Sequence, residues 1–355
     1  MRVLVRLPNW LGDTVMAVPV LRSLRAGLSP EDPVALAGPW ATVLAGQGLA
    51  ASGITYPRTW TGRLQTADSV GRFNPDVVLV LPNSFEAALA AWYWGGRRRI
   101  GYDTAGRGRL LTDRLPLPEP RCHQIDEYLG LLVPLGIAPA TREPRLEVAD
   151  GETAGAEARD LLAAAGRAGR PCVGIHLGAA FGASKVWPPE RVAELCRSLD
   201  RRGLTPMLLG PPEDSAAERR VRERAEAPVP SLVGRDRPEL LPALLARLDA
   251  LVSGDTGVAH LAAALGTPVV TLFGPTDPRL TAPRGRATVI TKSVACAPCF
   301  QARCPIDHVC MRTITGEEVA EAVLGAMGAS ASAATRPGGG SQRDGRAHEP
   351  RRGDV

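Results

Sequence analysis

The fold of this chain is indicated most clearly by the stretch Ala250-Leu-Val-Ser-Gly-Asp-Thr-Gly-Val-Ala-His-Leu-Ala-Ala-Ala-Leu265 and by the run Val269-Val-Thr-Leu-Phe273 that follows it. Residues 250–252 form a short apolar run that predicts a strand, residues 257–265 predict a helix, and residues 269–273 predict a second strand. A strand, a helix and a strand in close succession are typical of a parallel sheet with helices packed on its faces. The sequence therefore predicts an α/β protein.

The same alternation runs through both halves of the chain, which are separated near residues 139–170 by a stretch first spaced by Pro and Glu and then rich in Ala and Gly. It predicts strands at 2–7, 34–37, 76–81, 99–102, 172–177 and 206–209, and helices at 13–26, 84–94, 124–135, 189–202, 237–247 and 315–327. We therefore expect two Rossmann-like, doubly wound domains, residues 1–165 and 166–328. The cleft between them should face the carboxyl ends of the strands, where open parallel sheets bind ligands. Residues 329–355, rich in Gly, Ser, Ala and Arg without periodicity, are expected to be a disordered tail.

Composition narrows the class of protein. Apolar residues make up 45% of the chain and charged residues 22%, as in a soluble globular protein. Aromatic residues are only 4% and the net charge is a mild +5, so we expect no nucleic-acid partner. No run approaches the roughly 18–20 apolar residues of a membrane span. The first residues, with a charge at Arg6, resemble a first strand rather than a signal peptide, and the seven Cys form no obvious secreted framework, so we expect a cytoplasmic protein. The sequence gives no indication of oligomeric state.

The segment Ser253–His260 is the strongest candidate for a binding site. It follows a short strand and opens a helix, and Gly254 and Gly257 permit tight turns and close approach of a ligand. The first N–H groups of a helix lack internal partners, which makes this terminus suited to a diphosphate. The alternative is that Asp255 or Thr256 simply caps the helix. His260, one turn in, could equally be a structural histidine.

A second candidate is Asp13, in the turn Gly12-Asp13 after the first strand. A carboxylate at the carboxyl end of that strand could act as a general base toward an acceptor hydroxyl. The alternative is again a helix N-cap. Pro19 should kink the helix that follows.

Lys185 and Glu213 lie in two loops of the second half. Only two of the 42 basic residues are lysines, Lys185 and Lys292, and Lys185 follows a Gly-rich loop. A compact ammonium there could neutralise a leaving diphosphate, or it could be an exposed solvated group. Glu213 could bind a ribose hydroxyl or complement a helix dipole. No two Asp have the Asp-x-Asp spacing of a divalent cation site on a sugar nucleotide, so we expect no metal and no other cofactor.

A cysteine cluster and an arginine triplet are two further candidate sites, and each could instead be purely structural. The thiols of Cys296, Cys299, Cys304 and Cys310 are spaced closely enough for a zinc site, a labile disulfide or packed reduced thiols. The triplet Arg97, Arg98 and Arg99 could bind anionic groups of an acceptor or form a solvated basic face. Trp92 and Trp94 beside it could dip into a membrane interface or pack.

The turn Gly12-Asp13 with Pro19, Leu21 and Leu24, together with Ser253–Pro278, resembles the bacterial lipopolysaccharide heptosyltransferases, glycosyltransferase family 9. The likeness spans about residues 1–327. It implies a GT-B fold and inverting, metal-free transfer of heptose from ADP-L-glycero-β-D-manno-heptose to the lipopolysaccharide inner core. The expected partners are this nucleotide sugar and a lipid A–Kdo acceptor at the inner face of the inner membrane. The Cys-Pro-Cys and Cys-Met region resembles the branch that adds the second heptose.

The resemblance also implies roles for single residues. Asp13 would be the general base, Lys185 would neutralise the departing phosphate, and Glu213 would contact the ADP ribose. The donor's heptose and diphosphate would be held by Asp255, Thr256, Gly257 and His260. The chain departs from the family at Ala179 and Ala180, where hydroxyl residues are frequent, so a phosphate contact there would come from backbone N–H groups or Ser184. A family 9 enzyme with another sugar or acceptor, and a non-catalytic Cys-rich scaffold, stay open as alternatives.

Overall fold

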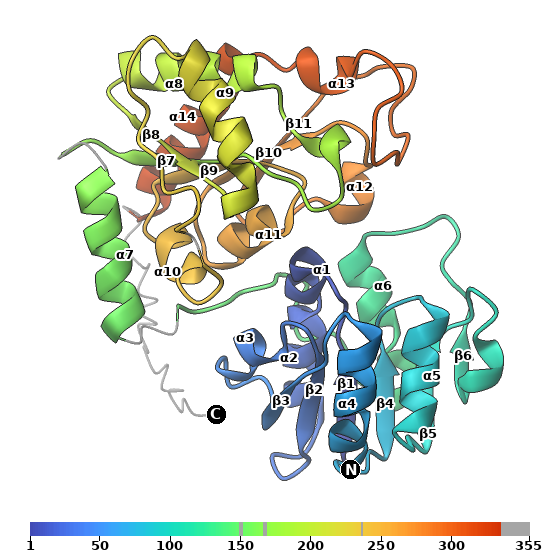
Figure 1. Cartoon of the computed structure of the whole chain (residues 1–355). Coiled ribbons are helices and arrows are strands. Elements are labelled where there is room, and N and C mark those ends of the chain that lie inside the picture. The colour runs from blue at the N-terminus through green and yellow to red at the C-terminus, as the bar shows by residue number, and fades with distance from the viewer. Residues whose placement is uncertain (149–151, 166–168, 236, 335–355) are drawn as a thin grey trace, which may run out of the picture.

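The computed structural model describes residues 1–148, 152–165, 169–235 and 237–334. These residues form two parallel sheets flanked by helices, one in each half of the chain, stacked one above the other in Figure 1. The first sheet has the order β3-β2-β1-β4-β5-β6 and the second β11-β10-β9-β7-β8. The strands are β1 Val3–Arg6, β2 Val34–Gly38, β3 Ser52–Thr55, β4 Val77–Val80, β5 Arg98–Tyr102, β6 Asp113–Leu115, β7 Cys172–His176, β8 Thr205–Leu209, β9 Ala250–Gly254, β10 Val269–Phe273 and β11 Ala287–Thr291.

The helices cover both sheets. In the first half they are α1 Leu11–Met16, α2 Val18–Gly27, α3 Ala41–Ala45, α4 Trp60–Gly71, α5 Phe85–Tyr93 and α6 Gln124–Gly130, with the 3-10 turns η1 Gly108–Leu110 and η2 Val133–Leu135. In the second half they are α7 Glu152–Ala165, α8 Pro189–Arg201, α9 Ser215–Arg224, α10 Leu241–Leu245, α11 Gly257–Ala264, α12 Pro278–Thr281, α13 Val309–Arg312 and α14 Gly316–Ala334, with η3 Ala183–Lys185 and η4 Pro212–Asp214. No helix among the described residues has the length and hydrophobicity needed to span a bilayer.

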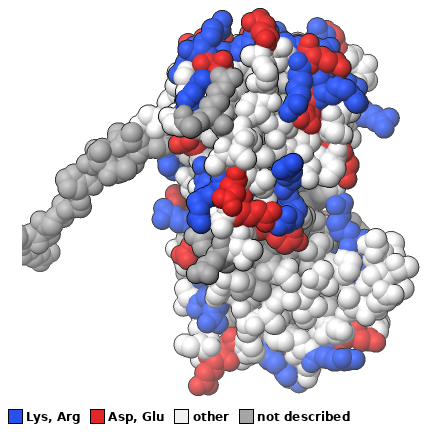
Figure 2. Space-filling model, turned by 60° about the vertical axis from the view of Figure 1, so that its left-hand side comes forward, with Lys and Arg blue, Asp and Glu red and all other residues white. Residues whose placement is uncertain are grey.

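The central strands explain why the sheets form. Every residue of β1, β4, β9 and β10 is buried, and these strands consist largely of Val, Leu and other apolar residues. Strands covered on both faces by helices take such continuous apolar runs, because no side of them meets water. On the face that Figure 2 shows, charged side chains lie mostly along the margins of the lower, N-terminal domain and leave a broad uncharged area between them.

Several predicted elements differ from the observed ones. The helix expected at 13–26 is two helices, α1 and α2, which meet at Ala17 because Pro19 lacks the N–H that would continue the first helix. The separating stretch contains a regular helix, α7, and the helix expected at 237–247 shrinks to α10. Helix α14 continues to Ala334, past the predicted end at 327. The rest of the expected tail, 335–355, lies outside the described residues, and the domain bounds stay a prediction.

The two halves of the chain touch at several points beside the cleft. His123 donates from Nε2 to the carbonyl of Ala282 at 2.9 Å, and Arg284 forms an ion pair with Asp126. Figure 1 shows α1 of the lower domain directly beneath α11 of the upper one. The carboxyl ends of β1 and β9 therefore face each other across this contact.

Candidate active site

The site is built around a contact between two glycines from different halves of the chain. Gly12 lies in the first turn of α1 and Gly257 begins α11. A Cβ on Gly257 would lie 2.8 Å from Leu11 Cβ and 2.9 Å from the backbone nitrogen of Gly12, and a Cβ on Gly12 would lie 3.0 Å from Cδ2 of His260. Real Cβ atoms do not come so close to backbone, so glycine is required for the two turns to meet.

Asp13 lies immediately after this contact on the N-terminal side. It is the third residue of α1, and Trp10 rather than Asp13 occupies the N-cap, so the capping alternative for Asp13 does not apply. The carboxylate is half-buried and accepts no hydrogen bond from any residue that the structure describes. It is therefore available to a proton donor that enters the cleft.

The surroundings of Asp13 raise its basicity. Burial raises the pKa of the Asp13 carboxyl above its ordinary value, and the negative charge of Asp255 adds to this effect. His260 and Lys185 act in the opposite direction without cancelling it. A carboxylate with a raised pKa takes up a proton more readily, which suits the general base predicted for this position.

Across the contact, Asp255 is held by three side chains. Lys185 donates from Nζ to Oδ2 of Asp255 and, at 3.2 Å, to its backbone carbonyl. Thr276 donates from Oγ1 to the same carboxylate oxygen at 2.8 Å, and His260 Nε2 lies 3.9 Å from the other oxygen. Burial alone would raise the pKa of Asp255, but the contacts with His260 and Lys185 outweigh it and hold this pKa below its ordinary value.

The amino terminus of α11 carries no side-chain cap. Thr256 occupies the N-cap position, but its hydroxyl pairs with Ser253 Oγ at 2.9 Å and does not cap the helix. Asp255 is engaged by Lys185 and Thr276 instead. The capping alternative is therefore excluded for both residues, and the first N–H groups of α11 have no side-chain acceptor. Buried His260, one turn further on, has an Nδ1 without a hydrogen-bond partner.

A small cavity beside this terminus extends the candidate donor site. It lies at the carboxyl ends of β7, β9 and β10 and is lined by His176, Gly178, Lys185, Ser253 and Gly254, among others. Burial lowers the pKa of His176 to about 4, so this histidine is neutral at pH 7. Glu213 is exposed on η4, in the loop after β8, which pairs with β7, and its contact with a ribose stays a prediction.

The loop that carries Lys185 is fixed by the Cys-rich segment. Ser184 donates from Oγ to the carbonyl of Gln301 and from its backbone nitrogen to that of Ala302 at 3.1 Å. His308 donates from Nε2 to the Ser184 carbonyl at 2.6 Å. Because the Ser184 hydroxyl is buried and already bonded, it anchors the loop instead of facing a phosphate, which corrects the prediction for this residue.

The four thiols of this segment are not grouped as metal ligands in the described part of the chain. No group of three or more His, Cys, Asp or Glu among the described residues has the geometry to hold a metal ion, and the four cysteines are free of disulfides. Cys310 is buried against the turn after β10, where a Cβ on Gly274 would lie 3.0 Å from its sulfur. Cys310 is thus a packed thiol, whereas Cys296 is exposed and Cys299 and Cys304 are half-buried.

The arginine triplet lies away from the cleft. Arg98 and Arg99 are the first residues of β5. They lie at the amino ends of the strands, whereas Asp13 lies at the carboxyl ends. Arg98 is paired with Asp113 at 2.6 Å, Arg99 donates to the carbonyls of Gly96 and Leu110, and Arg97 extends into solvent. The predicted acceptor contact of Arg97, Arg98 and Arg99 is therefore corrected. A strand's amino end cannot reach a site at the carboxyl ends.

A group of largely buried charged residues near the carboxyl end of β1 was not selected by sequence reasoning. Arg6 ends β1, is fully buried and donates to Asn9 Oδ1 at 2.9 Å. Glu86, in the first turn of α5, pairs with Arg6 at 3.4 Å and with Arg63 at 3.2 Å. In the sequence Arg6 is notable only as a charge in an apolar strand. No local pattern links it to Arg63 and Glu86, which are far away along the chain.

Three comparisons with known proteins show the family of this chain. Residues 63–310, more than half of the chain, match the family model "Glycosyltransferase family 9 (heptosyltransferase)". The chain is 29% identical over 301 residues to lipopolysaccharide heptosyltransferase 2 of Escherichia coli, covering 80% of this chain and 85% of that one. It is 28% identical to lipooligosaccharide heptosyltransferase 2 of Haemophilus ducreyi, covering 83% and 89%.

Solved structures give the same result for the fold. The structure of E. coli ADP-heptose lps heptosyltransferase II superposes with a TM-score of 0.79 at 26% identity, covering 93% of this chain and all of that one. A family 9 glycosyl transferase from Veillonella parvula superposes with a TM-score of 0.78 at 20% identity, covering 92% and 97%. The predicted fold class, GT-B with two doubly wound α/β domains, is confirmed. The chain belongs to glycosyltransferase family 9, the heptosyltransferases.

Proposed function

We propose that this protein transfers heptose from ADP-L-glycero-β-D-manno-heptose to the inner core of lipopolysaccharide, acting as the enzyme that adds the second heptose. The relatives with the same printed activity support the substrates, and the observation that carries the chemistry is the pairing of Asp13 with the Asp255–Lys185 cluster across the Gly12–Gly257 contact. The two groups sit on different domains, as an acceptor-side base and a donor-side cation require.

The reaction then divides between the two sides of the cleft. Asp13 accepts the proton of an acceptor hydroxyl, and that oxygen attacks the anomeric carbon from the face opposite ADP. The bond from this carbon to the phosphate oxygen breaks through an oxocarbenium-like state, with inversion. Lys185 and the uncapped N–H groups of α11 take up the negative charge that develops on the leaving ADP.

The donor contacts follow from the same geometry. Thr256, Gly257 and His260 lie at the helix terminus, where the diphosphate and heptose would be bound. Glu213, on the 3-10 turn η4 after β8, would contact the ribose of ADP. Because a lysine and a helix terminus supply the positive charge, the mechanism needs no metal ion. The enzyme works at the inner face of the inner membrane, where its lipid-linked acceptor resides.

Assaying the purified full-length chain against a panel of nucleotide sugars tests this function. We expect ADP-heptose to be used at least tenfold faster than ADP-glucose, UDP-glucose or GDP-mannose, with heptosyl-Kdo2-lipid A preferred over Kdo2-lipid A. The rate should not change in EDTA. Preference for another sugar would contradict the donor, preference for Kdo2-lipid A would contradict the second-heptose step, and loss of activity in EDTA would contradict the metal-free mechanism.

A further inference from the structure

The outward face of α5, on the N-terminal domain, is apolar where a helix facing water is usually polar, and two large apolar residues of α4 are exposed among polar ones. All four exposed residues of α5 are apolar or aromatic: Phe85, Leu89, Trp92 and Tyr93. The neighbouring helix α4 adds Trp60 and Leu64, which are 64% and 73% exposed. We call these six residues the α4–α5 face. Their spacing of three, four and seven positions places them on one side of each helix.

The α4–α5 face indicates a binding surface, because soluble proteins rarely expose contiguous apolar patches of this kind unless they bind something. From the sequence, two tryptophans could dip into a membrane interface, and the structure separates them. Trp92 is 55% exposed, but Trp94 is buried against Tyr56. The contact surface is therefore formed by two helices and not by the Trp92–Trp94 pair.

Basic residues surround the face. Arg58 precedes α4, Arg72 follows it, and Arg97 lies beyond the end of α5 with 74% of its side chain exposed. Arg58 and Arg72 have no acidic partner within the described part of the chain. The acidic groups on the two helices are neutralised or bonded locally. Asp68 accepts from Tyr93 Oη at 2.7 Å, and Glu86 pairs with two buried arginines.

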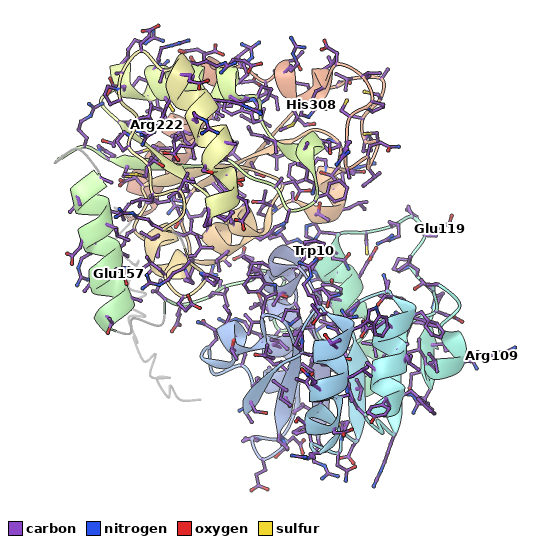
Figure 3. All side chains as sticks on the ribbon, in the orientation of Figure 1. Trp10, Arg109, Glu119, Glu157, Arg222 and His308 are labelled. Atoms are coloured by element: carbon purple, nitrogen blue, oxygen red, sulfur yellow. The ribbon has the colours of Figure 1, made fainter. Side chains whose placement is uncertain are left out.

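The face also reaches the entrance of the cleft. Helix α5 follows the carboxyl end of β4 and α4 follows that of β3, so Phe85 and Trp60 lie at the edge of the sheet that carries Asp13. Trp10, three residues before Asp13, is 45% exposed, and the Arg58 guanidinium lies 3.9 Å from the centre of its ring. Figure 3 shows Trp10 at the boundary with the C-terminal domain.

We propose that the α4–α5 face docks on an anionic lipid bilayer and holds the cleft entrance at the level of the headgroups. Exposed Trp, Tyr and Phe insert at the interface between headgroups and acyl chains, while arginines around them bind lipid phosphates. The proposal rests on the proposed function in one respect: a lipid-linked acceptor must be delivered to a cleft on a protein that stays outside the bilayer. Docking on this face presents the acceptor's sugars to Asp13.

Co-sedimentation of the full-length chain with vesicles tests the docking without any substrate. We expect binding to vesicles of about 70% phosphatidylcholine and 30% phosphatidylglycerol, little binding to phosphatidylcholine alone, and weakening by salt. The double variant Leu89→Gln, Trp92→Gln should lower the partition coefficient at least tenfold, because it removes two apolar side chains from the contact. The control Val133→Gln, Ile306→Gln changes two apolar residues outside the face that are more exposed than Leu89 and Trp92, and it should bind like wild type. All three proteins should melt at the same temperature.

Two results would overturn the docking: no binding of the wild type to anionic vesicles, or equal binding by Leu89→Gln, Trp92→Gln. If sedimentation velocity shows a wild-type dimer that this variant disrupts, without vesicle binding, the face joins two copies of the chain instead. Activity separates this proposal from the proposed function. The variant should transfer heptose about tenfold more slowly to acceptor in vesicles but at the wild-type rate to a delipidated acceptor. Vesicle binding without any heptose transfer would contradict the function alone.

Discussion

Asp13 and Asp255 lie on either side of one contact between domains, and the chain treats them in opposite ways. Asp255 is paired with Lys185 and bonded to Thr276, and its pKa is held low. Asp13 has no hydrogen-bond donor among the described residues, and burial raises its pKa. The difference teaches that similar local signals, an acid in a glycine turn that opens a helix, can prepare a carboxylate either to remain charged or to accept a proton.

The difference also shows where stability is given up for function. A buried carboxylate that is paired with a cation and accepts hydrogen bonds costs little, whereas one that is desolvated without a partner destabilises the fold. Asp13 is such a group, and the cleft is the place where this destabilisation has a use.

The largest expected effect comes from Asp13→Asn. Asparagine has nearly the same shape but cannot take the acceptor proton, so we expect the transfer rate to fall about 10²–10⁴-fold. ADP binding, measured by titration calorimetry, should stay within about twofold of wild type. A rate within tenfold of wild type would remove Asp13 from the mechanism.

Lys185→Ala removes the positive charge on the donor side, and we expect kcat to fall about 10²–10³-fold. The acceptor KM should change little. The chain offers a matched control in its other lysine, Lys292. This residue lies away from the site, and its Nζ is 2.7 Å from Glu318. Lys292→Ala should keep the wild-type kcat, and equal effects of the two variants would show that lysine charge acts nonspecifically.

Gly257→Ala tests the contact that brings the two carboxylates together. The added Cβ would meet Leu11 and the Gly12 backbone, so the turns must separate, and misplacement of about 1 Å can cost up to about 10²-fold in rate. Gly325→Ala in α14 is the control, because a Cβ there meets open space. If Gly257→Ala turns over like Gly325→Ala, the close approach of the glycines is not needed for transfer.

Thermal unfolding should show opposite signs for the two acids. Asp13 has a raised folded pKa, so its favourable contribution exists at low pH and is lost as the pH rises through that pKa; Asp13→Asn should therefore melt higher than wild type at pH 7, by about 2 °C. Asp255 has a lowered folded pKa, so its contribution is present at neutral pH and is lost as the pH falls through that pKa. Asp255→Asn should lose about 3–5 kcal/mol at pH 7, because the largely buried ammonium of Lys185 loses the carboxylate that neutralises it, and the loss should shrink in acid. Melting shifts of the same sign at pH 7 would contradict the comparison.

Much of this arrangement follows from local patterns. The strand, helix and strand around Ser253–His260 predicted a parallel sheet, and the turn at Gly12-Asp13 placed an acid at the end of the first strand, as observed. The rarity of lysine pointed to Lys185. Each of these signals lies within a few neighbouring residues.

What the sequence did not reveal depends on tertiary contacts. Thr276 bonds Asp255 from 21 positions further on, and only the packing of β9 beside β10 brings them together. The acceptor contact predicted for Arg97, Arg98 and Arg99 is wrong because these residues lie at the amino end of β5, whereas the cleft lies at the carboxyl ends of the strands. The α4–α5 face was missed because apolar residues at helical spacing indicate a core, and the pattern is the same when the helix faces outward.

The contact of Gly12 with Gly257 has a consequence for how this fold can diversify. It is formed mainly by backbone, so it fixes the distance between the domains while restricting few of the side chains around it. Sugar selectivity can then be redesigned, or drift in evolution, by changing residues that flank the two turns. The arrangement of the donor and acceptor halves relative to each other would stay the same.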